Sequence, residues 1–235
     1  MSITGLQTGA GGSLVQQAID AVTAHIRDGR LKVGDSLPGE GHFAGELGVS
    51  RAVMREAFGA LAALRMIDVG NGRKPRVAAI DGSVIAASLD HAVSTAQISV
   101  ADVWDVRRTI EQRTVMLAAE NRTDEQAAAI HALVDRMATQ VDFNSPTEDD
   151  IALHTLIAEA SGNALFVAIV RSFEPLMQVA VPEAWKTRTT LEQRRSIIAN
   201  HRALADAIDA RDPQAALLAM TGHFDASIET LLKRG

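Results

Sequence analysis

The order of apolar and polar positions divides the chain near residue 80 into two parts with different patterns. Before that point, three stretches carry apolar residues at helical spacing, and two short apolar runs separated by a turn follow. After it, no stretch shows the apolar–polar alternation of a half-buried strand. The pattern therefore predicts a mainly α protein, with helices and one small hairpin in the first part and helices alone in the second.

The first part contains the elements of a winged helix-turn-helix. One amphipathic stripe runs from Leu14 to Ile26, a second short helix ends at Gly48, and Ser50 can cap a third helix. The apolar residues of this third helix recur on one face, at Met54, Ala57, Phe58 and Leu61.

A hairpin is predicted directly after these helices. Asn71-Gly72 separates two short apolar runs, and Asn-Gly is a strong signal for a tight hairpin turn. Arg73, Lys74 and Arg76 follow the turn, so the hairpin would form a basic wing. The alternative is a helical hairpin that carries a surface β-turn.

The start of the third helix has the composition of a DNA-reading surface. Small and basic side chains in a first helical turn can reach base edges and phosphates in the major groove. Double-stranded operator DNA is therefore the expected partner. The predicted DNA contacts are Ser50, Arg51, Ala52 and Arg55 in the helix, and Asn71, Gly72 and Arg73 in the wing.

Residues 14–78 resemble the N-terminal domain of GntR-family transcription regulators. The resemblance rests on Leu37-Pro38-x-Glu40, Val49-Ser50-Arg51, Arg55-Glu56-Ala57 and Leu61. Two positions depart from the family pattern: Gly41 stands where the family usually has an arginine that contacts DNA, and Gly39 replaces a small polar cap. The resemblance implies DNA binding, but the operator sequence and affinity do not carry over.

The second part predicts an all-α bundle of six or seven helices. Capping pairs, a Ser-Gly-Asn interruption and prolines divide it into helical segments. These signals occur at Val100–Asn121, Thr123, Ser145–Glu148, Ser161–Asn163, Pro175, Thr190 and Asp212–Pro213. We expect a disordered tail at 1–12, a winged helix-turn-helix domain at 13–80, a linker at 81–84 and an all-α domain at 85–235.

Composition and charge refine this picture. Nothing at the N-terminus resembles a signal peptide and the longest strongly apolar run is too short to span a membrane, so we expect a cytoplasmic protein without a membrane partner. Residues 1–80 carry nine Lys or Arg and seven Asp or Glu, whereas residues 81–235 carry 14 and 22. A slightly basic head on an acidic body suits DNA contact at one end only.

Four side chains of the second part could form a metal site. Asp150 and His154 lie four residues apart on one helix face, and His201 and His223 lie in two other helices. Spacing alone also allows solvated or hydrogen-bonded histidines. The imidazoles suit zinc, nickel, copper, iron or cobalt, and the carboxylate also allows manganese.

The second part resembles the ligand-binding (FCD-type) domain of the FadR-like GntR subfamily. The matching motifs are Asp105-x-Arg107-x-x-x-Glu111, Ala118-Ala119, Asp150-x-x-x-His154, Ser161-Gly162-Asn163, His201-Arg202-x-Leu204-x-Asp206-Ala207-Ile208 and His223. In metal-binding members the ligands are this Asp and these three His, so the resemblance implies a divalent transition metal, with zinc the first choice. His25, His42, His91 and His131 match no ligand position.

The resemblance also indicates where an effector would bind. Arg107 occupies the family position that faces the cavity, where its planar fork can grip a small organic acid beside the metal. The alternative is a surface Arg107 that pairs with Glu111. Asn163 either lines the pocket or merely interrupts the helix.

The leading hypothesis is a homodimeric transcription regulator, by family expectation a repressor, that responds to a small carboxylate. An acyl-CoA-responsive regulator of the same subfamily is one alternative. A metal-dependent enzyme is another, but the sequence has no H-E-x-x-H arrangement that would place a glutamate base beside the metal. The third alternative is an architectural DNA binder with a purely structural metal.

Overall fold

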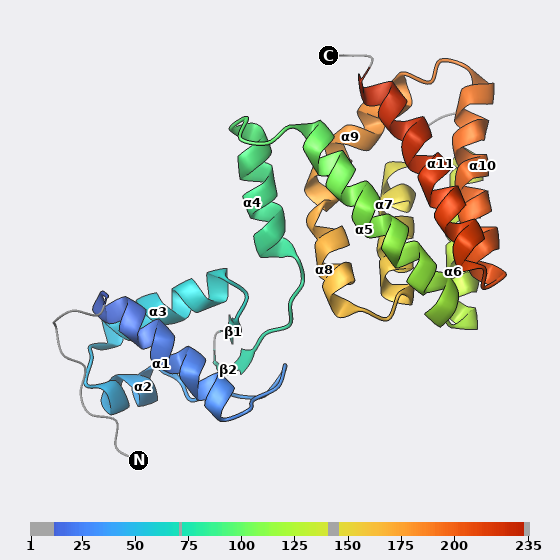
Figure 1. Cartoon of the computed structure of the whole chain (residues 1–235). Coiled ribbons are helices and arrows are strands. Elements are labelled where there is room, and N and C mark those ends of the chain that lie inside the picture. Colours follow the sequence, from blue (N-terminus) through green and yellow to red (C-terminus); the bar gives the residue numbers. More distant parts are fainter. Residues whose placement is uncertain (1–11, 71, 141–145, 233–235) are drawn as a thin grey trace. The chain divides into compact units, whose positions relative to one another are not determined.

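The computed structural model describes residues 12–70, 72–140 and 146–232 (Figure 1). The chain forms two compact units, Met1–Val84 and Ile85–Gly235, and each is described by itself. The described part is mainly helical, with a single two-stranded sheet, which confirms the predicted fold class. No single described helix is long and apolar enough to cross a membrane. Two consecutive helices, Ala164–Ser172 and Glu174–Lys186, would together have the length and apolar composition of a membrane span, but the chain bends by 54° between them.

The first unit is a three-helix core with a hairpin. Its elements are α1 (Leu14–Asp28), α2 (Glu40–Leu47), α3 (Arg51–Ala63), β1 (Ile67–Gly70) and β2 (Arg73–Val77). The Ser50 hydroxyl accepts a hydrogen bond from the Val53 N–H at 3.2 Å, and Gly48 ends α2 in the left-handed conformation with φ 68°. Phe43, Met54 and Phe58 are buried in the apolar core. The predicted caps and core face are therefore present.

The hairpin is antiparallel, with Ile67 opposite Val77 and Asp68 opposite Arg76. Gly72 has φ 71°, the left-handed conformation that a tight hairpin turn requires. Asn71 lies outside the described residues. One feature was not predicted: Ser36 forms an isolated bridge with Arg76, so the segment before α2 pairs with the wing.

The second unit is a helical bundle. Its helices are α5 (Val100–Asn121), α6 (Asp124–Gln140), α7 (Thr147–Ala160), α8 (Ala164–Ser172), α9 (Glu174–Lys186), α10 (Leu191–Asp209) and α11 (Pro213–Leu232), and α4 (Ser83–Ser94) precedes them. Helix α5 packs on α7, α10 and α11, and α6 packs on α7 and α10 (Figure 1). The shared core consists of aliphatic side chains together with Trp104, Phe173, Trp185 and Phe224.

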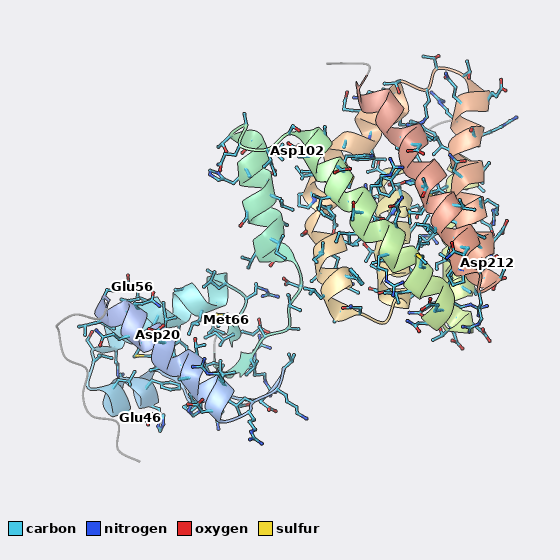
Figure 2. All side chains as sticks on the ribbon, viewed as in Figure 1. Asp20, Glu46, Glu56, Met66, Asp102 and Asp212 are labelled. Atoms are coloured by element: carbon cyan, nitrogen blue, oxygen red, sulfur yellow. The ribbon has the colours of Figure 1, made fainter. Side chains whose placement is uncertain are left out.

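Most helix boundaries follow the predicted signals. Thr123 and Gln126 exchange capping hydrogen bonds, as do Thr190 and Gln193. Asp102 and Asp212 lie at the starts of α5 and α11 (Figure 2), where carboxylates accept hydrogen bonds from free backbone N–H groups. The capping box predicted from Ser145 lies partly outside the described residues.

The described part has one helix more in this region than the upper estimate of seven. Helix α4 begins inside the segment predicted as a linker, because the Asp81 carboxylate accepts a hydrogen bond from the Ser83 N–H at 3.0 Å and so starts a helix there. The predicted break near Pro175 is present: α8 ends at Ser172, and α9 begins at Glu174.

Candidate functional site

Three helices of the second unit bring three histidines together. His154 comes from α7, His201 from α10 and His223 from α11, and one nitrogen of each lies within 4.8 Å of the others. All three side chains are buried, with exposed fractions of 4% or less. Residues far apart in the sequence thus converge on one point, as a metal site requires.

Asp150 completes this group from the preceding turn of α7. Its Oδ1 lies 3.1 Å from His201 Nε2, and the residue is buried. Burial by itself would raise the pKa of this carboxyl, but the His201 contact and the nearby His154 and His223 lower the pKa overall. Asp150 is therefore ionised, which is the form that coordinates a cation.

The imidazoles fit a metal because several of their nitrogens have no other partner. Among the described residues, His154 Nε2, His201 Nδ1 and His223 Nδ1 are buried without a hydrogen bond, and His201 Nε2 has only the Asp150 carboxylate, itself a candidate ligand, beside it. A buried polar atom without a partner is costly, and coordination would satisfy it. Burial, followed by the proximity of His201 and His154, lowers the pKa of His223 well below its ordinary value, so its imidazole is neutral and able to coordinate.

Glu111 supports the histidine group from α5. Its carboxylate contacts His154 Nδ1 on one side and Arg107 Nε on the other. A carboxylate that accepts the Nδ1–H of a histidine fixes the ring and leaves Nε2 free for a metal. Burial would raise the pKa of Glu111, but Arg107 and His154 hold it below its ordinary value. No role in the metal site was predicted for Glu111 from the sequence, although its spacing of four residues from Arg107 was a usable signal.

Arg107 combines the two alternatives that the sequence left open. It is buried and lines the cavity beside the histidines, yet it also pairs with Glu111. Its guanidinium carbon lies 5.3 Å from the centre of the Trp104 ring and 5.5 Å from that of Phe224. The charge of Arg107 is thus already balanced inside the protein.

The cavity beside the histidines is small, about 30 Å³. Its wall includes Asp150, His201, His223 and Arg188. Arg188 was missed in the sequence because it belongs to none of the motifs quoted there. Asn163 is exposed and does not line this cavity; its side chain instead caps α8 by accepting a hydrogen bond from the Leu165 N–H at 3.0 Å.

The predicted DNA-reading residues lie on the surface of the first unit. Arg51, Ala52 and Arg55 are exposed on α3, and Arg55 Nε lies 3.9 Å from Glu40 Oε2 of α2. Ser50 uses its hydroxyl as the helix cap. The structure therefore leaves the three α3 side chains accessible to DNA.

Two of the predicted wing contacts, Gly72 and Arg73, are described by the structure, and both are exposed. Lys74 and Arg76 are exposed as well, and Arg76 donates a hydrogen bond to the Gly34 carbonyl oxygen at 2.6 Å. Gly41 on α2 is exposed, and an added Cβ there would have no atom within 4 Å. The missing arginine at this position is therefore not the result of crowding.

Two family models match the chain. Residues 14–77 match the bacterial regulatory proteins of the gntR family, and residues 102–226 match the FCD domain. The second match includes the whole histidine group and Glu111.

Relatives and solved structures agree with these matches. The Glc operon transcriptional activator of Escherichia coli K12 is 28% identical over 87% of this chain and 83% of its own length. The transcriptional repressor NanR of Citrobacter rodentium is 29% identical over 86% of this chain and 78% of its own length. A Streptococcus agalactiae GntR structure shares the fold, with a TM-score of 0.64 and 24% identity over 90% of this chain and 97% of that one.

Proposed function

The chain belongs to the GntR family of bacterial regulatory proteins and is a DNA-binding transcription regulator with an FCD effector domain, and we propose that a metal-dependent carboxylate response controls its operator affinity. In this proposal two copies bind a two-fold operator, and a small organic acid binds beside a divalent metal in the second unit. The observation that carries the proposal is the buried group of three imidazoles and one carboxylate with unsatisfied ring nitrogens.

The metal would be held by Asp150, His154, His201 and His223. Zinc is the first choice because imidazole and carboxylate ligands suit it, while nickel, manganese, iron and cobalt are alternatives. A metal that accepts five or six ligands keeps positions for an effector oxygen when these four residues bind it. Glu111 fixes the His154 ring, and the apolar core around the site limits access of water.

The first unit would read DNA through α3 and the wing. Arg51, Ala52 and Arg55, which are exposed on α3, would enter the major groove, while Gly72 and Arg73 would contact the DNA backbone. Asn71, at the tip of the predicted turn, belongs to the same proposal. A homodimer would present two such heads to a two-fold site.

An effector changes DNA affinity only if it binds the DNA-competent and DNA-incompetent arrangements differently. The relatives include a named activator and named repressors. We keep repression as the predicted direction because a repressor needs only to occupy its operator, whereas an activator needs a further contact with the transcription machinery. A reporter assay with and without the regulator decides this point.

The other regulatory hypotheses receive less support. A cavity of about 30 Å³ with charged walls does not suit a long acyl chain, which disfavours an acyl-CoA effector. An architectural DNA binder with a structural metal would bind DNA equally with and without an acid. The relatives and the solved structures are those of regulators rather than enzymes.

The full chain tests this proposal directly. The operator is first selected from a random DNA pool with zinc-loaded protein, and its affinity is then measured by fluorescence anisotropy at fixed salt. We expect about one zinc ion per chain by elemental analysis and a change in affinity when a small carboxylate is added. Metal-free protein from zinc-supplemented cells, or DNA affinity that no carboxylate alters, would overturn the proposal.

A further inference from the structure

Arg188 is the least compensated charge in the cavity wall. It is 8% exposed, and no hydrogen bond or ion pair of its guanidinium is present among the described residues. Burial lowers the pKa of Arg188, and the nearby Asp150 carboxylate only partly opposes this effect. No Arg188 nitrogen is among the fully buried atoms without a partner, so the five N–H donors of its guanidinium reach the open space of the cavity, where an acceptor can bind them.

The backbone around Arg188 is held in place. Its N–H donates to the Trp185 carbonyl oxygen at 3.0 Å, and its own carbonyl oxygen accepts from Arg194 Nε at 3.1 Å. The Arg194 guanidinium carbon in turn lies 5.7 Å from the centre of the Trp185 ring. The turn after α9 therefore presents Arg188 to the cavity from a fixed backbone.

Arg107, the other arginine of the cavity wall, has partners for its charge, unlike Arg188. Glu111 neutralises it, and the rings of Trp104 and Phe224 cover its guanidinium. An incoming carboxylate would have to compete with the Glu111 carboxylate for the same donors. Arg188 has no such competitor among the described residues.

The balance of buried charges also favours an anion next to Arg188. The ionised buried groups of the described site are Arg107, Arg188, Glu111 and Asp150, which cancel when the three imidazoles are neutral. A divalent metal would add two positive charges to this buried site. An anion bound next to Arg188 would then balance positive charge from the metal, which the side chains of the described site leave unbalanced.

We propose that Arg188, rather than Arg107, receives the carboxylate of the effector, and that the Trp104 indole N–H donates to an oxygen of the same molecule. Trp104 lines the same cavity, and its Nε1 is buried without a partner among the described residues. The cavity volume of about 30 Å³ restricts the effector to a small acid. This inference rests on the proposed function and specifies its recognition residues.

The test uses full-length, zinc-loaded protein with sodium acetate as the probe. Thermal shift and isothermal titration are run against sodium chloride at matched ionic strength, with acetamide as the uncharged analogue. We expect acetate, but not acetamide, to stabilise the wild type. Arg188→Gln should weaken acetate binding about tenfold or more while elemental analysis shows zinc retained, since hydrogen bonds to charged groups have this strength. Trp104→Phe should weaken it less.

Two further variants complete the design. Arg195→Gln removes the same charge from an exposed position on α10 and should leave acetate binding unchanged. Arg188→Lys keeps the charge without the planar fork and should bind acetate several-fold more weakly than the wild type. If Arg188→Gln does not fold, the lysine variant decides the result.

The outcomes separate the two proposals. Equal acetate affinity in the wild type and in zinc-retaining Arg188 variants would overturn this inference and leave the proposed function standing. A wild type that holds no zinc would overturn both. A wild type that holds zinc without responding to acetate would overturn this inference alone, because the proposed function requires only that some small carboxylate alters DNA affinity. If Arg188 merely balanced Asp150, its replacement would change the melting temperature without acetate, but not the increment that acetate adds.

Discussion

The two units place their charged side chains in opposite environments. In the described part of the first unit, no charged side chain is buried, and the core is entirely apolar. The second unit buries Arg107, Glu111, Asp150 and three histidines next to one another. The first unit thus has an apolar core with its charged side chains at the surface, whereas the second unit buries charged groups, which the proposed metal and anion would compensate.

The largest difference between the units is expected in the free energy of unfolding, when one ion pair is broken in each unit. In metal-free protein, Glu111→Ala should lower the free energy of unfolding by about 3–5 kcal/mol, because it leaves Arg107 buried without its partner. Glu40→Ala removes the exposed ion pair with Arg55 and should change the free energy of unfolding by less than about 1 kcal/mol. Urea unfolding followed by circular dichroism measures both. Similar losses would contradict the contrast between the units.

Zinc should act on the second unit alone. At a free zinc concentration about 1,000 times the dissociation constant, the metal should stabilise the unit by about 4 kcal/mol. His201→Ala should lose most of this increment, because His201 is one of the four proposed ligands. His131→Ala, which alters a half-buried histidine outside the group, should retain it. Calorimetry with and without chelator gives the increments, and zinc stabilisation that survives His201→Ala would exclude this site.

A surface residue of the first unit should matter for DNA rather than for stability. Arg55→Ala should weaken operator binding by about 1–3 kcal/mol, the usual value of one good base contact, without changing the unfolding transition. Arg27→Ala, exposed at the end of α1, serves as the charge-matched control. Fluorescence titration at fixed salt compares them, and equal affinities would remove Arg55 from the DNA contacts.

The wing should contribute affinity that depends on salt. Replacing Arg73 and Lys74 with Gln should flatten the slope of log K against log salt by about 0.9 for each phosphate that the wing no longer neutralises. Arg76 is left intact because it holds the Gly34 carbonyl oxygen and so supports the wing itself. Titrations at several salt concentrations give the slope. An unchanged slope would show that these two side chains do not bind phosphates.

The smallest effect should come from Asp81. Its pKa falls from 3.8 to about 2 because the Ser83 N–H and hydroxyl donate to it, with a smaller contribution from Arg65. The resulting stabilisation is present above the ordinary pKa of 3.8 and is lost as the pH falls from there through about 2. Asp81→Asn should remove this part of the acid dependence. Since 34% of the Asp81 side chain is exposed and solvent screens its interactions, the change should be slight, and acid unfolding curves of the two proteins measure it.

Local signals predicted most of the fold. The Ser50 and Thr190 caps, the Gly48 stop and the Pro175 break depend on neighbouring residues, so they could be inferred from the sequence. The pairing of Ser36 with Arg76 could not, because it joins residues distant in sequence.

The candidate site shows the same limit. The spacing of Asp150 and His154 placed both on one face of a helix, and His201 and His223 were candidates from two other helices. The family resemblance then favoured these four residues as one metal site. The bridging position of Glu111 and the buried, unpaired state of Arg188 depend on how α5, α7 and the turn after α9 pack together. Periodicity carries no information on such packing. Asn163 was left between lining the pocket and interrupting the helix, and the structure shows a local role at the start of α8.

The open surface at Gly41 has an evolutionary consequence. Every glycine codon becomes an arginine codon by a single base change, and a Cβ added at this exposed position meets no neighbouring side chain or distant backbone atom within 4 Å. A lineage carrying this gene can therefore gain or lose an arginine on α2 in one mutational step without a folding penalty from crowding. Where an arginine at this position contacts DNA, as the family resemblance implies, operator preference would change faster than the fold, and regulators that differ only here would diverge in target genes before they diverge in structure.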